Sequence, residues 1–202
     1  MTRKTTLRDI QKADTRQRLL DAASRVFDRE GYDMATVDQI SSEAGASRPT
    51  FYAHFRDKEE VLSELMDGYI AKGIPFMLRF PGEDPTPELL IKWLHEVGDF
   101  IKQESALFSL LSQMIGHRPP NSKNHSRSVG QAWLVSLASS SPAFARAISP
   151  DQPNLKARVK AELLLLELVW ASASILSGEN EALNEARVEL VAQSIYDFLT
   201  TA

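Results

Sequence analysis

The chain has 202 residues, of which 43% are hydrophobic and 25% charged, and its formal net charge is −4. This composition is typical of a folded globular protein, because disordered chains have too few apolar side chains to offset the entropy of ordering. The absence of cysteine excludes disulfides, thiol catalysis and zinc–thiolate sites. The length allows one large domain, or a small domain joined to a larger one.

The apolar segments of the chain do not indicate export or membrane insertion. The first residues, MTRKTTLRDIQKAD, are basic but have no apolar segment of the kind found in secretory signals. The longest apolar run, LLLLELVW at 163–170, is far shorter than the roughly 20 residues needed to cross a bilayer. We therefore expect a cytoplasmic protein with no membrane partner.

Charge is distributed unevenly along the chain. Residues 1–18 contain six basic and two acidic side chains, whereas residues 61–202 contain 12 basic and 16 acidic ones. The distribution of charge bears on a nucleic-acid partner more than the total does. The basic start is either a solvated surface or an unstructured arm that follows a DNA minor groove.

Helix punctuation is frequent and strand signals are scarce, so the sequence predicts an all-α fold. Asp14 and Gln17 have the spacing of a capping box, which predicts a first helix over about 15–29. Thr36 and Gln39 repeat that spacing before a helix of about two turns.

A third short helix and a longer fourth one follow directly. Ser47 is placed to cap the third, and Asp57 with Glu60 to cap the fourth, over 57–73. The segment GIPFMLRFPGEDPTP then ends the periodicity. Further helices are expected over about 87–103, 105–116, 122–139, 142–148, 154–177 and 180–200, which makes nine or ten in total.

Two domains are therefore predicted, an N-terminal one over 1–60 and a helical one over 61–202, with the helix at 57–73 linking them. Three short helices with a glycine turn between the second and third make a helix-turn-helix arrangement. Helices this short depend on packing, and one shared small core is predicted from Phe27, Ile40, Ala44, Phe51 and Phe55.

The third helix has two unlike faces. Phe51 and Phe55 fall on one side of a helical wheel, while Pro49, Thr50 and Tyr52 fall on the other. An exposed tyrosine on so short a helix has no packing reason to be there. This outward face therefore predicts a binding partner.

The segments TVDQISSEAGASRPTFYAHFRDKEEVL at 36–62 and AASRVFDREGY at 22–32 resemble the DNA-binding signature of TetR-type transcriptional regulators. The resemblance covers about residues 15–65, a quarter of the chain. It implies an N-terminal helix-turn-helix domain and a larger helical domain that dimerises and often holds a small-molecule effector. The DNA partner it implies is a double-stranded, pseudo-palindromic operator.

Roles follow from the resemblance position by position. Arg48 is the candidate for reading a guanine, since its planar fork can donate twice to O6 and N7; the alternative is a phosphate contact. Pro49 is placed to meet a thymine methyl group, and His54 is either a DNA contact or a packed histidine. The side chains expected to hold the DNA backbone are those of Thr36, Ser47, Thr50, Tyr52, His54 and Lys58.

Pro49 leaves two helix registers open. If Ser47 is the N-cap, the proline takes the second helical position; if Arg48 is the cap, it takes the first. The second register agrees better with the bias of a residue before proline against helical angles. Family members more often carry glycine where this chain has Pro49, so the turn is expected to be stiffer here.

In the C-terminal region, residues 154–177 are apolar around most of the helix and residues 180–200 carry one apolar stripe. These two helices are expected to form a homodimer, the alternative being burial within their own domain. Aromatic and methionine side chains on the middle helices predict an apolar pocket for a small lipophilic or aromatic effector. The candidates are Trp93, Phe100, Phe108, Met114, Trp133 and Trp170.

An enzyme is the competing class of function. The four histidines have no partner in any recognised metal or catalytic pattern, and no phosphate loop or serine elbow occurs. No cofactor or metal is therefore expected. The sequence predicts a homodimeric, ligand-responsive transcriptional repressor, although an activator needs the same DNA-reading helix and a protein-binding role for the motif stays open.

Overall fold

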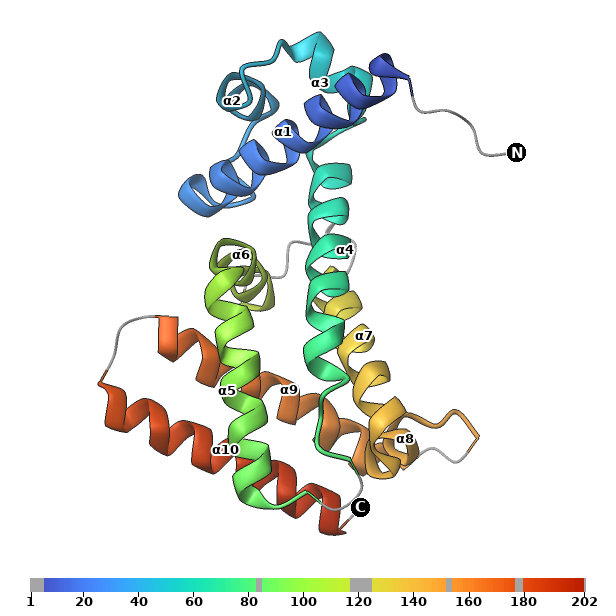
Figure 1. The fold of residues 1–202 in the computed structure, drawn as a ribbon, viewed down its shortest axis with the longest axis vertical. Helices are drawn as coiled ribbons and strands as arrows, with labels where there is room; N and C mark the ends of the chain where they lie inside the picture. Colours follow the sequence, from blue (N-terminus) through green and yellow to red (C-terminus); the bar gives the residue numbers. More distant parts are fainter. Residues whose placement is uncertain (1–5, 83–84, 117–124, 152–153, 177–179, 202) are drawn as a thin grey trace. The chain divides into compact units, whose positions relative to one another are not determined.

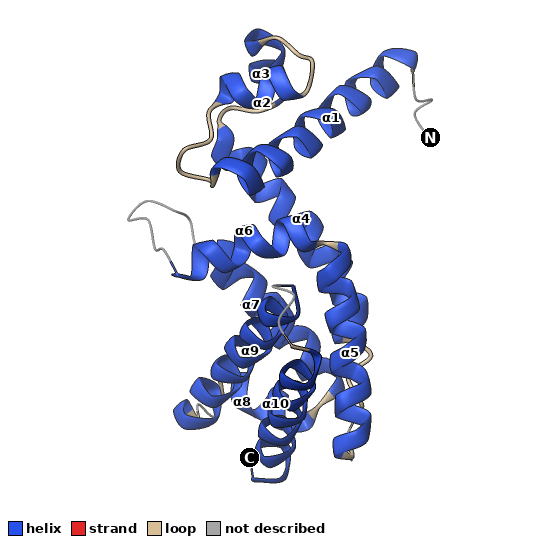
Figure 2. Cartoon of the chain, turned by 90° about the vertical axis from the view of Figure 1, so that its left-hand side faces the viewer, coloured by secondary structure: helices blue, strands red, loops and turns tan. Residues whose placement is uncertain are grey.

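The computed structural model describes residues 6–82, 85–116, 125–151, 154–176 and 180–201, and every regular element among them is a helix (Figures 1 and 2). The prediction of an all-α fold with nine or ten helices is confirmed. The helices in the described part of the chain are α1 Leu7–Glu30, α2 Val37–Glu43, α3 Arg48–His54, α4 Lys58–Met77, α5 Pro87–Gln103, α6 Ser105–Gly116, α7 His125–Ser140, α8 Pro142–Ile148, α9 Leu155–Leu176 and α10 Glu181–Thr201.

The chain folds into two compact units, Met1–Gly68 and Tyr69–Ala202, which we call the N-terminal and C-terminal units. Helix α4 contributes residues to both. The boundary expected between residues 60 and 61 lies in the same helix. That residues 1–60 and 61–202 act as separate functional domains stays a prediction.

Helix α1 begins eight residues before the predicted start at residue 15. Thr6 Oγ1 accepts from the backbone N–H of Asp9 at 3.2 Å, and the Asp9 carboxylate accepts from the Thr6 N–H at 3.0 Å. This upstream capping box starts the helix, so Asp14 and Gln17 lie inside it. An unstructured arm is therefore wrong for residues 7–13, and residues 1–5 lie outside the described part.

The other predicted caps of the N-terminal unit are present. Thr36 Oγ1 accepts from Gln39 N–H at 3.2 Å, and Gln39 Oε1 accepts from Thr36 N–H at 2.8 Å. Asp57 Oδ1 accepts from Glu60 N–H at 2.8 Å at the start of α4. Between α2 and α3 the chain turns through Gly45, whose φ of 63° lies in the left-handed region that favours glycine.

Ser47 is the N-cap of α3, and its Oγ accepts from the Thr50 N–H at 3.2 Å. Pro49 is therefore the second helical residue, and the register with Arg48 as the cap is wrong. Arg48 is helical although it precedes a proline. The serine cap satisfies a free N–H of the first turn, and this gain outweighs the pre-proline bias.

The core of the N-terminal unit contains the predicted aromatic and aliphatic side chains. Phe27, Ile40 and Phe51 are fully buried, and Phe55 is nearly so. The rings of Phe51 and Phe55 lie 5.7 Å apart between centroids. The small core predicted from the sequence is therefore confirmed, and it fixes which side of α3 faces outward.

The core of the C-terminal unit is built from aromatic rings on several helices. Helices α9 and α10 lie side by side, and α8 packs near the end of α7 (Figures 1 and 2). The ring pairs, with centroids 4.9–5.7 Å apart, are Tyr69–Phe100, Tyr69–Trp133, Phe76–Phe100, Phe80–Trp93, Phe80–Phe144 and Phe144–Phe198.

Candidate nucleic-acid interface

Helix α3 presents one face to solvent. Phe51 is buried, whereas Arg48 and Pro49 are exposed and Tyr52 is 48% exposed. Thr50 is half-buried. The predicted division of the helix into a packed face and an outward face is confirmed, and Arg48, Pro49 and Tyr52 lie at the surface.

Arg48 is held loosely by its neighbours. Its Nη1 lies 3.3 Å from Asp38 Oδ2 on α2, and its guanidinium carbon lies 5.7 Å from the Tyr52 ring centroid. A hydrogen bond with Tyr52, and then the Asp38 carboxylate, raise the pKa of Arg48 above its usual value. Both members of the ion pair are mostly exposed. Because exposed pairs are weak, the guanidinium can exchange Asp38 for another acceptor.

The hydroxyl groups expected at phosphates are engaged in capping. Thr36 Oγ1 lies 2.9 Å from Gln39 Oε1, and Ser47 Oγ lies 2.8 Å from Thr50 Oγ1. Thr36 and Ser47 are exposed at the starts of α2 and α3. Each hydroxyl therefore orders its helix start in the free protein, and a phosphate contact stays a prediction.

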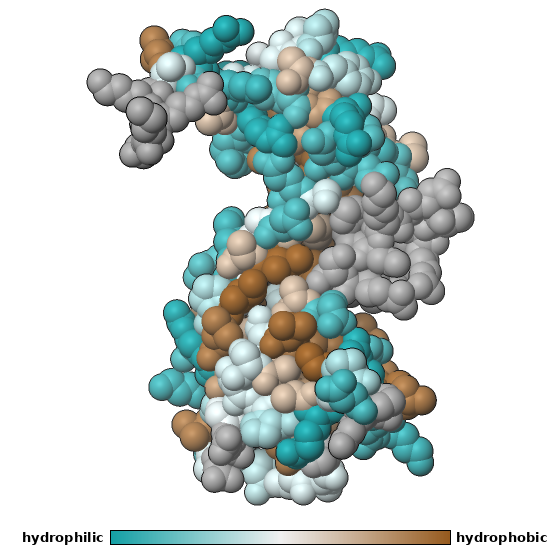
Figure 3. Space-filling view, turned by 90° about the vertical axis from the view of Figure 1, so that its right-hand side faces the viewer, coloured by the Kyte–Doolittle hydropathy of each residue, from teal (hydrophilic) through white to brown (hydrophobic). Residues whose placement is uncertain are grey.

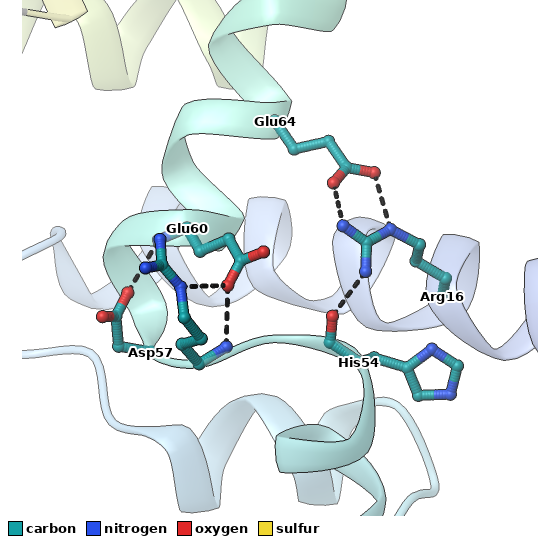
Figure 4. Close-up of polar contacts among 6 residues, drawn as sticks. Arg16, His54, Asp57, Glu60 and Glu64 are labelled. Atoms are coloured by element: carbon teal, nitrogen blue, oxygen red, sulfur yellow. Dashed lines mark hydrogen bonds and ion pairs between the residues drawn. The ribbon is translucent and has the colours of Figure 1, made fainter.

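Arg16, which no sequence pattern singles out, ties three helices together (Figure 4). Its Nε donates to Glu64 Oε1 at 3.0 Å, and its Nη2 donates to the second oxygen of the same carboxylate. Its Nη1 donates to the carbonyl of His54 at the end of α3. The guanidinium carbon also lies 4.1 Å from the Phe55 ring centroid. Arg16 thus fixes the end of α3 against α1 and α4.

Lys58, the predicted phosphate clamp, has its ammonium group occupied within the protein. Nζ donates to the backbone carbonyls of Tyr32 at 2.7 Å, Asp33 at 3.0 Å and Ala35 at 2.9 Å. These bonds use all three N–H donors, and burial lowers the pKa of Lys58. Its contact with phosphate stays a prediction, and bracing the loop before α2 is a competing structural role.

Arg18 works in the same way as Arg16 and Lys58. Its Nη2 donates to the carbonyl of Ala44 at 2.6 Å, at the C-terminal end of α2 beside Gly45. Carbonyls at helix ends lack intrahelical partners; Arg16 and Arg18 donate to such carbonyls here, while Lys58 donates to carbonyls of the loop before α2. No periodic pattern predicts such contacts, because they join residues 23 to 48 positions apart.

His54 is tied down at its carbonyl and is not presented as a cation. Its Nδ1 is buried without a hydrogen-bond partner among the described residues, and its ring points away from the Arg16 guanidinium in Figure 4. Burial, followed by the charges of Arg16 and Lys12, lowers the pKa of His54. The neutral ring fits packing better than phosphate binding, and a DNA contact stays a prediction.

The residues expected to line an effector pocket separate into groups. Phe100 and Trp133 meet around Tyr69, while Trp93 packs on Phe80 in another part of the core. Phe108 is also buried. The Met114 side chain lies outside the described part of the chain.

Trp170 does not belong to this core. Its side chain is 61% exposed on α9, where the Arg187 guanidinium carbon lies 5.0 Å from the ring centroid. Its role at an effector site stays a prediction. The sequence does not show that Trp170 lies on the surface, because a helix that is apolar on most sides does not reveal which side is covered.

An apolar stripe runs along the exposed side of α9. Its members recur every three or four residues, as one helical face requires, and they are 46% to 73% exposed. Helix α10, which packs beside α9, adds Leu183 and Leu190 at seven-residue spacing. The stripe on α9 consists of Leu155, Val159, Leu163, Leu166 and Trp170.

Neither a metal centre nor a membrane span occurs within the described residues. No three histidine, aspartate or glutamate side chains there are grouped so that they could hold a metal ion. None of the helices in the described ranges is both long enough and apolar enough to cross a bilayer.

Helix α3 is short, follows a glycine turn and is packed on its phenylalanine side, and it exposes an arginine and a tyrosine. These features define a helix-turn-helix DNA-binding unit. Residues 19–65 match the family model described as bacterial regulatory proteins, tetR family. Residues 19–65 are therefore a DNA-binding domain of the tetR family. The matches support a DNA-binding transcriptional regulator as the class of this protein.

Relatives agree with this placement. The chain is 28% identical over 167 residues to the HTH-type transcriptional regulator AcrR of Shigella flexneri, covering 81% of this chain and 73% of the relative. It is 44% identical over 66 residues to SrpR of Pseudomonas putida, covering 33% of this chain and 30% of that protein.

Solved structures share the fold. The transcriptional regulator FadR of Bacillus subtilis, solved in complex with stearoyl-CoA, is similar with a TM-score of 0.64 at 17% identity, covering 88% of this chain and 98% of FadR. At that identity the likeness concerns the fold alone. The two-domain helical architecture that the family resemblance implied is therefore confirmed.

Proposed function

We propose that the protein is a homodimeric repressor that leaves a pseudo-palindromic operator when a small lipophilic effector binds. The observation that carries the proposal is the outward face of α3, where Arg48 and Tyr52 are exposed while Phe51 and Phe55 hold the helix down. A DNA-binding regulator works beside the chromosome, which supports the cytoplasm as its compartment.

On DNA, α3 would enter the major groove with its N-terminal end toward the bases. Arg48 would exchange Asp38 for guanine O6 and N7, and Pro49 would meet a thymine methyl group. Polar side chains around the helix would hold the register on the DNA backbone. These are Thr36, Ser47, Thr50, Tyr52, His54 and Lys58, with Lys58 acting after release from a carbonyl or through its charge alone.

The homodimer would form through α9 and α10. These two helices pack side by side, so the exposed stripe on α9 from Leu155 to Trp170 has Leu183 and Leu190 of α10 on the neighbouring helix. A second copy of the chain offers the same surface, and a two-fold axis pairs such a surface with itself. Two α3 helices would then lie about 34–36 Å apart, one per half-site.

The effector would bind in the C-terminal unit. The structural similarity to FadR, which was solved with stearoyl-CoA, supports a lipophilic effector here. Helix α4 shares its residues between the two units, so a ligand that moves its C-terminal part would act on the part that carries Glu64. By linkage, DNA would weaken effector binding by the same factor as the effector weakens DNA binding.

Footprinting of the purified protein on the DNA that flanks its own gene tests the proposal. We expect a protected palindrome that fades when a lipophilic compound is added. Absence of protection at low salt contradicts the whole proposal. Transcription in vitro from the protected promoter separates repressor from activator, since the footprint alone is the same for both.

Two substitutions separate base reading from backbone binding. Arg48→Ala should relax the preference at one base pair per half-site by about tenfold to a hundredfold. Lys58→Ala should weaken binding to every sequence alike and should also lower the melting temperature, because the loop loses its brace. A Lys58→Ala protein with unchanged melting temperature would show that the brace is unimportant.

Introducing charged side chains into the apolar stripe on α9 tests the proposed dimer interface. Leu163→Glu combined with Leu166→Glu should give monomers in sedimentation velocity and abolish operator binding while helical content is retained. Val135→Glu, at a residue of α7 with similar exposure, is the matched control and should leave the dimer intact. A double variant that stays dimeric contradicts this interface.

A further inference from the structure

Two polar atoms are buried in the C-terminal unit without partners among the described residues. They are the phenolic oxygen of Tyr69 on α4 and the indole Nε1 of Trp133 on α7. Tyr69 is fully buried and Trp133 is 1% exposed, and their rings lie 5.7 Å apart between centroids. Most buried polar groups have a partner and losing one is costly, so two neighbouring exceptions require an explanation.

Trp93, the other buried tryptophan of this unit, has a hydrogen-bond partner for its indole N–H. Trp93 Nε1 donates to the backbone carbonyl of Phe76 on α4 at 2.9 Å. Trp133 also faces α4, yet its Nε1 points at Gly73 and finds no acceptor among the described residues. Since the same helix satisfies one indole and not the other, the unpartnered donor is a local feature of the Tyr69–Trp133 pair.

Gly73 lies one turn after Tyr69 on the same face of α4. A Cβ atom there would lie 3.1 Å from Trp133 Nε1 and 3.3 Å from a Phe100 ring carbon. The glycine therefore lets the two rings approach the helix closely. Phe100 in turn packs against Tyr69 and stacks on Phe76, with centroids 5.3 and 4.9 Å apart, so further aromatic rings adjoin the Tyr69–Trp133 pair.

The charge beside the pair is already balanced. Lys72 Nζ donates to both carboxylate oxygens of Glu104, at 2.7 and 2.9 Å. Burial, and then the charge of Glu104, raise the pKa of Tyr69 far above its usual value. The phenol thus stays protonated, and a charged ligand would have no free counter-charge from this ion pair.

We propose that Tyr69 and Trp133 form the polar end of the effector site and that the effector is an uncharged, flat molecule with a carbonyl oxygen. This inference rests on the proposed function, in which the C-terminal unit holds an effector. The carbonyl oxygen accepts from the phenol O–H and the indole N–H, since such an oxygen has two lone pairs. The apolar body of the ligand packs against Phe100 and Phe76.

A pair of probes of nearly equal shape tests the carbonyl requirement. Acetophenone has the acceptor oxygen, and α-methylstyrene replaces it by a methylene group. The indole N–H resonances of the 15N-labelled full chain are recorded during titration with each probe, and Trp133→Phe assigns the relevant peak. We expect a saturable downfield shift of the Trp133 peak with acetophenone and none with α-methylstyrene.

Three variants separate binding from folding. Tyr69→Phe should weaken acetophenone about tenfold, the equivalent of one good hydrogen bond, and should leave the melting temperature unchanged, because the lost hydroxyl has no partner among the described residues. Trp133→Phe should also weaken acetophenone but should melt lower, because it removes volume from a buried ring. Trp93→Phe is the matched control: it loses a satisfied bond, so it should melt lower while acetophenone affinity is unchanged. A lower melting temperature for Tyr69→Phe, with unchanged affinity, overturns the inference.

Other outcomes also overturn it. They are a Trp133 peak that does not move with acetophenone, one that moves equally with both probes, and one that already shows a cross-peak to a bound water in the free protein. The titration contains no DNA, so each of these outcomes contradicts only the proposed effector site and does not bear on the footprinting result. Absence of a footprint, in contrast, contradicts the proposed DNA-binding function, and the shifts of the Trp133 peak still report whether acetophenone binds.

Discussion

The N-terminal and C-terminal units are held together by different kinds of contact. In the first, Arg16, Arg18 and Lys58 donate to backbone carbonyls at the ends of helices and loops. In the second, stacked and tilted aromatic rings join the helices. On the face drawn in Figure 3, the N-terminal unit is mostly hydrophilic, while the C-terminal unit has larger apolar areas.

The two units use different contacts because their helices differ in length and because α3 keeps one face exposed. Helices of seven residues bury little apolar surface, so polar ties must supply what packing does not. These ties also leave one face of α3 free for DNA. The longer C-terminal helices fill their own core and still expose the stripe on α9, which is apolar surface available for assembly.

The largest effect is expected from removing a ring from either core. Phe51→Ala should cost the N-terminal unit about 3–5 kcal/mol, enough to unfold α1 to α3, because Phe51 is fully buried. Phe108→Ala removes an equally buried ring from the C-terminal unit. Hydrogen exchange should show loss of protection confined to the unit that carries each substitution. Loss in both units from either variant would mean that they fold as one.

Much of the N-terminal unit could be predicted because its signals are local. Thr36, Ser47 and Asp57 each cap a helix within three residues of themselves, and the spacing of Phe51 and Phe55 identifies the packed face. The predicted start of α1 was wrong because two capping-box patterns, at Thr6 and Asp14, lie on one continuous helix. Only the upstream one forms, and spacing alone does not rank them.

The rest depends on contacts between distant residues. Arg16 reaches Glu64 across 48 positions, and a basic residue near the start of the chain looks the same whether it meets a carboxylate, a carbonyl or a phosphate. In the C-terminal unit, aromatic residues were correctly placed on helices. Their sorting into core, as for Trp133, and surface, as for Trp170, depends on helix packing that periodicity does not encode.

The second prediction removes a polar tie from the N-terminal unit. Arg16→Met keeps the length of the side chain but not its donors, and should cost about 1–2 kcal/mol of unfolding free energy. Urea unfolding followed in the N-terminal unit measures this. Glu64→Gln in a double-mutant cycle should show coupling with Arg16. Arg56→Met is the control, because its exposed pair with Glu60 should contribute too little to detect; equal losses in the two variants would contradict the special role of Arg16.

The third prediction concerns the turn between α2 and α3. Gly45→Ala should cost about 1 kcal/mol, since its φ is 63° and an added Cβ would lie 3.4 Å from Arg18 Nη2. Gly68→Ala is the matched control: this helical glycine has nothing within 4 Å of an added Cβ, so the change should stabilise α4 by up to about 1 kcal/mol. Chemical unfolding of both variants checks the opposite signs, and the same sign in both would refute the turn argument.

The smallest effect is a pH dependence of the N-terminal unit set by His54. Burial and the charges of Arg16 and Lys12 lower its folded pKa, while the unfolded value is about 6.5. As the pH falls through 6.5 the unfolded chain binds the proton first, so stability is full above that pH and declines below it. Melting of the N-terminal unit between pH 7.5 and 5.5 should therefore fall less in His54→Gln than in the natural protein. His95→Gln, on α5 of the other unit, should behave like the natural protein; equal slopes for all three would show that the buried Nδ1 of His54 is protonated without cost, and the ring would again be available as a cation for phosphate.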